Sequence, residues 1–128
     1  MMMRRLLLPL LLAATPAAAQ PDWRSARDVE LRLAPNDITP AEVRLKAGEP
    51  ARLRIISGTL GAYRLSAPGL LSAATMRQRD RTALSGGLLI QPGEVRELVI
   101  NAPAGRYPIA STSIVRRLLG MRAEIIVE

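Results

Sequence analysis

After residue 28, apolar and charged residues alternate in short runs, a pattern typical of β-strands with one buried face. Residues 29–33 read Val-Glu-Leu-Arg-Leu, and a Pro-Asn-Asp turn signal follows them. Similar runs recur along the chain and are separated by turns that contain Pro or Gly. We predict further strands over residues 42–46, 51–56, 88–90, 97–100, 106–110 and 121–127, with a short strand ending at Leu65.

Seven or eight short strands, with turns about every ten residues, predict an all-β fold with two packed sheets. Only a Gly- and Pro-containing turn separates the runs at 42–46 and 51–56, so we predict that these two strands form a β-hairpin. Residues 70–87 have no clear period, and either a short helix or a long loop fits them. The core must be mainly aliphatic, because the chain has one Trp, two Tyr and no Phe.

The first 19 residues follow a different pattern. Arg4 and Arg5 precede an apolar run at residues 6–14, and three alanines end the segment at Ala19. This is the three-part pattern of a secretory signal peptide, and we expect cleavage between Ala19 and Gln20. The apolar run is too short to cross the ~30 Å hydrocarbon layer of a bilayer. We therefore expect a single mature domain at residues 20–128 that is soluble, periplasmic or secreted, and not stably inserted in a membrane.

The sequence contains no His and no Cys. This excludes disulfide bonds, thiol catalysis, zinc sites built from Cys or His, His-ligated haem and a Ser-His-Asp triad. The remaining enzyme options are a Ser–Lys pair or a pair of carboxylates. Lys46, the only lysine, is expected far from Ser111, and the alternation is expected to turn Glu94 and Glu97 outward. We expect no catalytic activity and no catalytic residues.

The chain is basic, with 18 Lys and Arg against 11 Asp and Glu and a net charge of +7. We expect no nucleic-acid binding, because such proteins pair clustered basic residues with aromatic side chains that stack on bases. Arg77, Arg79 and Arg81 would share one face of an extended segment, with Asp80 opposite. Such a face suits anionic lipid or an acidic partner, whereas a solvated loop is the simpler interpretation.

Three segments, taken in order, resemble the cupredoxin family. ITPAEVRLKAGEPARLRIIS, at residues 38–57, resembles the opening hairpin of cupredoxins. IQPGEVRELVINAPAGRYPIAS, at 90–111, resembles the later turn and strands that lead to the family's cysteine. LLGMRAEIIVE, at 118–128, resembles the ending that carries the axial methionine. The resemblance covers residues 38–128 apart from 70–87, and it implies a two-sheet Greek-key β-sandwich.

The family's copper centre uses a Cys thiolate, two His imidazoles and usually a distant Met. The resemblance places Ser111 at the cysteine position, Arg116 at the second histidine and Met121 at the axial methionine. The first histidine position falls at Tyr63, or at Arg64 if the alignment shifts by one residue. A Ser hydroxyl is a poor copper ligand, and a guanidinium has no lone pair to donate. We therefore expect no bound metal cofactor and no blue-copper electron transfer.

Two interpretations of this region remain open. Met121 and Met76 together offer two thioether ligands for Cu(I), unless both simply fill the core. Residues 111–117 offer three hydroxyls and two arginines, which suit a carboxylate or phosphate. Alternatively, Arg116 closes the vacated copper position against Tyr63 and backbone carbonyls.

Our leading hypothesis is an exported, non-catalytic binding or scaffold domain with a lost type 1 copper site. One alternative is a copper-handling protein that binds copper weakly through Met121 or together with ligands from a partner. Another is a cell-envelope interaction module that uses its arginines. The expected partner is an unidentified protein or a small anion.

Overall fold

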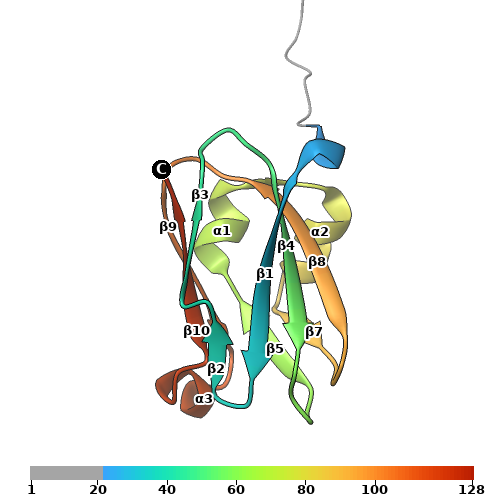
Figure 1. The fold of residues 1–128 in the computed structure, drawn as a ribbon, viewed down its shortest axis with the longest axis vertical. Coiled ribbons are helices and arrows are strands. Elements are labelled where there is room, and N and C mark those ends of the chain that lie inside the picture. Colours follow the sequence, from blue (N-terminus) through green and yellow to red (C-terminus); the bar gives the residue numbers. More distant parts are fainter. Residues whose placement is uncertain (1–21) are drawn as a thin grey trace, which may run out of the picture.

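The alternating runs form two five-stranded sheets in the computed structural model, which describes residues 22–128 (Figure 1). The strand order is β2-β1-β4-β8-β6 in the first sheet and β3-β10-β9-β5-β7 in the second. The inward-facing side chains of both sheets make one mainly aliphatic core, in which Leu31, Leu53, Leu98, Ile109 and Ile125 are fully buried. The predicted all-β fold with two packed sheets is confirmed. The predicted signal peptide and its cleavage site lie outside the described residues.

Each sheet mixes parallel and antiparallel pairs. The first contains β1 (Arg27–Ala34), β2 (Asp37–Thr39), β4 (Ala51–Ser57), β6 (Thr75–Met76) and β8 (Val95–Asn101). The second contains β3 (Glu42–Leu45), β5 (Tyr63–Ser66), β7 (Leu88–Ile90), β9 (Gly105–Ser111) and β10 (Arg122–Val127). The parallel pairs are β1 with β4 and β3 with β10.

The predicted hairpin between β3 and β4 is wrong. β3 pairs with β10 in the second sheet, whereas β4 pairs with β1 and β8 in the first. Alternation specifies which face of a strand is buried, but it does not specify the neighbouring strand. The five residues 46–50 are enough to cross the roughly 10 Å between packed sheets, so the chain changes sheet at this turn.

Residues 70–87, which the sequence left open, form two short helices and the edge strand β6. α1 spans Pro68–Ala73, and a proline in its first turn suits a helix start. α2 spans Gln78–Leu84 and packs against β7 and β8. β6 pairs with only two residues of β8. Beyond the end of this edge strand, α2 packs against β8 instead.

The two remaining short helices lie at opposite ends of the sandwich (Figure 1). A single 3-10 turn at Trp23–Ser25 precedes β1. α3, at Ile114–Leu118, lies within the segment that joins β9 to β10. No helix within residues 22–128 is long and apolar enough to cross a membrane.

Candidate functional site

Three connections meet at the end of the sandwich where α3 lies, which we call the α3 end (Figure 1). The amide of Gly58, just after β4, donates to the Leu33 carbonyl at 2.9 Å and ties the β4–β5 loop to the end of β1. On the other side, the α3 segment approaches the β1–β2 turn closely. A Cβ atom built on Gly120 would lie 2.8 Å from the Asn36 carbonyl oxygen. The residues proposed from the cupredoxin resemblance lie at or beside this junction.

Tyr63 and Arg116 are in direct contact at the α3 end. The Arg116 guanidinium carbon lies 4.0 Å from the centroid of the Tyr63 ring, within the range of a cation–π interaction. The Tyr63 hydroxyl donates to the Pro35 carbonyl at 3.0 Å, and the side chain is buried. Within residues 22–128, the Arg116 guanidinium makes no hydrogen bond or ion pair. Arg116 therefore covers the tyrosine ring without the backbone carbonyl contacts that the sequence interpretation included.

Ser111 ends β9 and is almost fully buried. Its hydroxyl oxygen accepts a hydrogen bond from the Ser113 amide at 3.1 Å, and its own amide donates to the Met121 carbonyl at 3.0 Å. The Ser113 hydroxyl in turn accepts from the Arg116 amide at 3.4 Å and caps α3. Two of the three hydroxyls in this segment thus serve to turn the chain from β9 into α3.

Met121 is fully buried, and its amide donates to the Arg116 carbonyl at 2.9 Å. Met76 lies elsewhere: it pairs with Ile100, which pairs on its other side with Ala51 at the start of β4. The α3 end lies beyond the last residue of β4 (Figure 1). The suggested pair of thioether ligands is therefore wrong, because the two methionines lie toward opposite ends of the sandwich.

The residues at the proposed copper position do not suit type 1 copper. Ser111 and Tyr63 offer hydroxyls, Arg116 offers a permanent cation, and Met121 alone offers a soft donor. Within residues 22–128, no three Asp, Glu, His or Cys side chains are grouped closely enough to hold a metal ion. A cation beside this position would also repel a copper ion electrostatically.

No protein-family model and no curated protein matches the sequence. Solved structures do match. A multi-copper oxidase from Pseudomonas thermotolerans aligns with 81% of this chain and 30% of its own, at 23% identity and a TM-score of 0.61. Auracyanin A, a "blue" copper protein from Chloroflexus aurantiacus, aligns with 81% of this chain and 100% of its own, at 14% identity and a TM-score of 0.57. The chain has the cupredoxin fold.

Another multicopper oxidase, from Aquifex aeolicus, matches 86% of this chain at 10% identity and a TM-score of 0.64. This chain spans less than a third of each oxidase, since it covers 30% of one and 31% of the other. Auracyanin A, by contrast, matches over its full length. The match therefore covers the whole of auracyanin A but only part of each oxidase.

The arginines near α2 do not form a shared face in this cupredoxin-like domain. Arg77 forms a two-bonded ion pair with the buried Asp80, with Nε to Oδ2 at 2.6 Å and Nη2 to Oδ1 at 3.1 Å. Arg81 donates to the carbonyls of Leu71 and Ala74. Arg79 alone of the three is exposed. Neither the extended face nor the loop forms, because residues 78–84 are helical, the alternative that the sequence also left open. Residues two apart on a helix, unlike those on a strand, do not lie on one side.

Charged residues on the outer face of the first sheet pair with one another across the strands. Arg52 on β4 lies opposite Asp28 on β1, and their side chains hydrogen-bond at 2.8 Å. Arg54 likewise lies within 3.4 Å of Glu97 on β8. The hydrogen bond to Asp28 raises the pKa of Arg52, against a smaller opposing effect of burial. Much of the basic charge on this face is therefore matched by neighbouring carboxylates.

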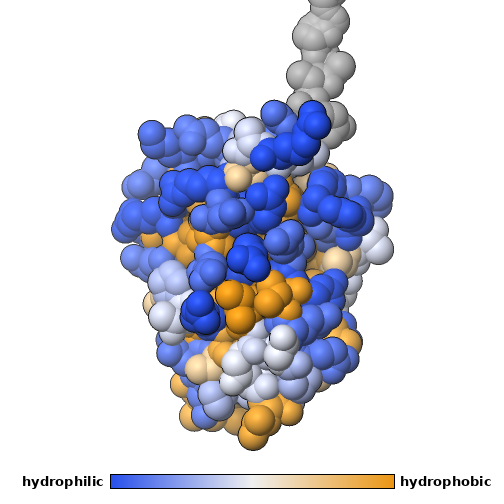
Figure 2. Space-filling model, turned by 45° about the vertical axis from the view of Figure 1, so that its right-hand side comes forward, coloured by the Kyte–Doolittle hydropathy of each residue, from blue (hydrophilic) through white to orange (hydrophobic). Residues whose placement is uncertain are grey.

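Sequence reasoning missed an apolar surface at the α3 end. Four aliphatic side chains of the α3 segment are exposed, at fractions from 60% to 75%: Ile114, Val115, Leu118 and Leu119. Leu60, in the β4–β5 loop, is fully exposed. Hydrophobic side chains are visible at the lower end of the molecule in Figure 2. The spacing 114, 115, 118, 119 is typical of one side of a helix, but we predicted no helix between residues 111 and 120.

Proposed function

We propose that the protein is an exported, non-catalytic, cupredoxin-like binding domain whose type 1 copper site has been lost. The observation that carries this proposal is the contact of Arg116 with the Tyr63 ring, with 4.0 Å between guanidinium carbon and ring centroid. Two side chains that the resemblance places at histidine positions are packed against each other and provide no imidazole. The chain has the cupredoxin fold, but the residues at the proposed copper position offer no thiolate and no imidazole.

The copper-handling alternative has less support. Met121 is fully buried, so its thioether is not presented to a metal or to a partner's ligands. The nearest proposed companion, Met76, lies toward the other end of the sandwich. A single buried thioether is too few ligands to retain Cu(I).

The positions of the remaining candidate groups support a non-catalytic role. Lys46 follows β3, and the next amide, that of Ala47, bonds to Glu128 at the C-terminal end of β10, away from Ser111. The Glu94 carboxylate accepts the Gln91 amide at 2.8 Å and closes a turn. Glu97 is engaged with Arg54. These three groups, the acid–base candidates from the sequence, are either distant from Ser111 or engaged in contacts that hold the fold. Export rests on the signal pattern of the first 19 residues.

The α3 end is the binding surface in this proposal. Helices normally bury their apolar side, yet α3 has no buried residue, and its Arg116 lies against the body of the domain while four aliphatic side chains in its segment are exposed. Residues 111–121 contain two arginines and no acidic residue. Protein interfaces combine an apolar centre with arginine. The matching partner is a protein with an apolar surface bordered by carboxylates.

A site-specific photo-cross-linker at Leu118 of the exported protein tests this surface. The matched control carries the cross-linker at Thr82, an exposed residue of α2. We expect one protein product at position 118 that is absent at position 82. The purified partner should then bind the wild type in calorimetry and should bind Leu118→Asp much more weakly.

Equal products at both positions, or equal binding by the variant, would contradict the proposal. Co-sedimentation of the purified protein with anionic phospholipid vesicles, lost in Leu118→Asp, would assign the surface to a membrane instead. The experiment therefore separates the two kinds of surface that an apolar and basic patch suits.

A further inference from the structure

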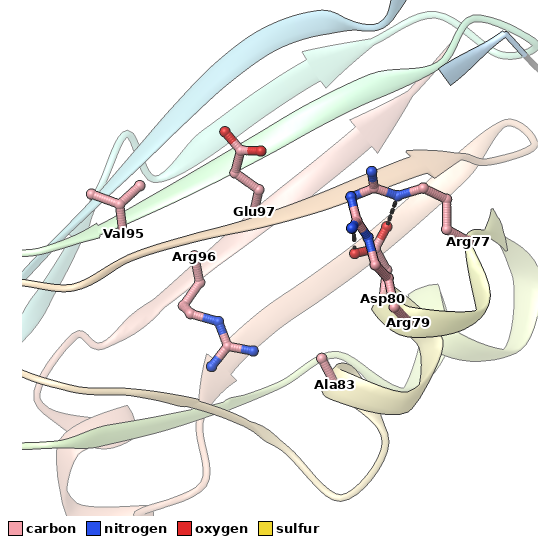
Figure 3. Close-up of a pocket in the computed structure, with 7 residues that line it drawn as sticks. All are labelled: Arg77, Arg79, Asp80, Ala83, Val95, Arg96 and Glu97. Carbon is pink, nitrogen blue, oxygen red and sulfur yellow. Dashed lines mark hydrogen bonds and ion pairs between the residues drawn. The ribbon is translucent and has the colours of Figure 1, made fainter. Parts of the chain in front are cut away.

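A groove of about 560 Å³ lies between α2 and β8 (Figure 3). Arg77, Arg79, Asp80 and Ala83 line its helical side. Val95, Arg96 and Glu97 line its strand side. Three of these seven side chains are guanidinium groups, so the charge balance of the groove decides what it can bind.

The Arg77–Asp80 pair forms a fixed wall of the groove. The Asp80 carboxylate is buried and accepts both hydrogen bonds from Arg77, and its Oδ2 also accepts the Val99 amide at 3.2 Å. β6 pairs with Ile100 and Asn101 of β8 but not with the adjacent Val99. The Asp80 carboxylate therefore accepts the Val99 amide in place of a strand partner. The pair is electrically neutral and holds Arg77 in one orientation.

The other carboxylate, Glu97, does not neutralise the groove. Figure 3 shows Glu97 and Arg96 leaving β8 in opposite directions, as consecutive strand residues do. The Glu97 carboxylate lies 3.4 Å from Arg54 and 3.9 Å from Arg52 on the neighbouring strand. Its charge is therefore balanced on the outer face of the first sheet.

Two arginines of the groove keep uncompensated charge. Arg96 donates to the Leu89 carbonyl on β7 at 2.8 Å, and this single bond holds the side chain without cancelling its charge. Arg79 is exposed, and it makes no ion pair or side-chain hydrogen bond with any residue from 22 to 128. A guanidinium has five N–H donors, so Arg96 retains donors for a ligand after its bond to Leu89.

We propose that this groove binds a small oxyanion, a carboxylate or phosphate group, through Arg79 and Arg96. Arg96 is held in place by Leu89, and planar guanidinium groups bind carboxylate and phosphate oxygens in pairs. Ala83, on the helical side of the groove, adds apolar surface near the charges. A carboxylate with a short aliphatic chain therefore fits better than acetate. The inference is independent of the partner proposed for the α3 end.

NMR titration of the isotope-labelled mature protein tests the groove. The probes are inorganic phosphate, acetate and butyrate, each added at constant ionic strength. We expect saturable shifts at the amides of residues 79, 83, 95 and 96. Tighter binding of butyrate than of phosphate would assign the site to aliphatic carboxylates, and the reverse order would assign it to phosphates.

Two variants and one control decide the assignment. Arg79→Gln should weaken binding about tenfold or more, because a charge-assisted hydrogen bond is lost. Arg96→Gln should do the same, although it also removes the bond to Leu89, so its thermal melting must be measured. Arg106→Gln is the control, since Arg106 is exposed on the second sheet and paired with Glu124. Absence of saturable shifts, or equal weakening by all three variants, would overturn the proposal.

Discussion

Arg116 lies with its guanidinium carbon 4.0 Å from the centroid of the Tyr63 ring, at two positions where the cupredoxin resemblance expects imidazoles. The Tyr63 hydroxyl is tied to Pro35 at 3.0 Å, so the ring is fixed at its far end as well. In the proposed function, an always-charged side chain and a phenol lie where the resemblance expects two neutral ligands.

The first prediction concerns the stability of this contact. Arg116→Ala should lower the free energy of unfolding by about 1 kcal/mol, the size of a partly exposed cation–π interaction. The neighbouring Arg117→Ala is the control and should change it by less than about 0.5 kcal/mol, because Arg117 is exposed. Urea unfolding of the three proteins measures both. Equal effects of the two substitutions would show that the ring contact contributes nothing particular.

The second prediction concerns Asp80. Asp80→Ala should destabilise the domain by about 3 kcal/mol, since it leaves Arg77 unpaired and the Val99 amide without its acceptor. Glu124→Ala breaks the more exposed ion pair with Arg106 and should cost less than about 1 kcal/mol. Thermal melting monitored by circular dichroism compares them. A loss for Asp80→Ala no larger than for Glu124→Ala would contradict a structural role for the buried pair.

The third prediction concerns the approach of the α3 segment to the β1–β2 turn. Gly120 has φ of 122°, and an added Cβ would lie 2.8 Å from the Asn36 carbonyl oxygen. Gly120→Ala should therefore destabilise by about 2 kcal/mol or more, through strain and collision together. Gly48, with φ of 84° and open space around its Cβ position, is the control. Gly48→Ala should cost about 1 kcal/mol; a Gly120→Ala variant no less stable than this would refute the close contact.

The fourth prediction concerns export. Expression of the full chain in a Gram-negative host should yield a periplasmic protein with Gln20 at its N-terminus, because a basic, apolar and small-residue pattern precedes that position. Mass spectrometry of the periplasmic fraction reads the terminus directly. Recovery of a chain that still begins at Met1, in the membrane fraction, would show that the leader is not removed.

Alternation along the chain was sufficient to predict most of the strands, because most of them bury alternate residues. It did not predict the short strands β2 and β6, which are too short to show a period. It was also not sufficient to pair the strands: β3 and β4 look like a hairpin in sequence but belong to different sheets. Residues 70–87 gave no period, since the helices there are short and are held by long-range bonds such as Asp80 with Val99. No local pattern reports such a bond.

The candidate site was predicted in part for a similar reason. The cupredoxin resemblance proposed Tyr63, Ser111, Arg116 and Met121, and the structure brings Tyr63 and Arg116 into contact. The outward apolar side of α3 was missed, because Ile-Val-Arg-Arg-Leu-Leu reads as buried helix or as loop when its orientation is unknown. The groove was missed because Arg79 and Arg96 approach it from a helix and a strand that are distant in sequence.

Copper titration of the mature protein tests whether the type 1 copper site has been lost. Cu(II) added at neutral pH should give no intense visible charge-transfer band, because no thiolate is present, and calorimetry should show no tight binding. The same titration with Cu(I) under reducing conditions covers the thioether of Met121. Neither ion should bind with sub-micromolar affinity. Sub-micromolar binding of copper by the wild-type mature chain, weakened by Met121→Leu, would show that the copper site is not lost.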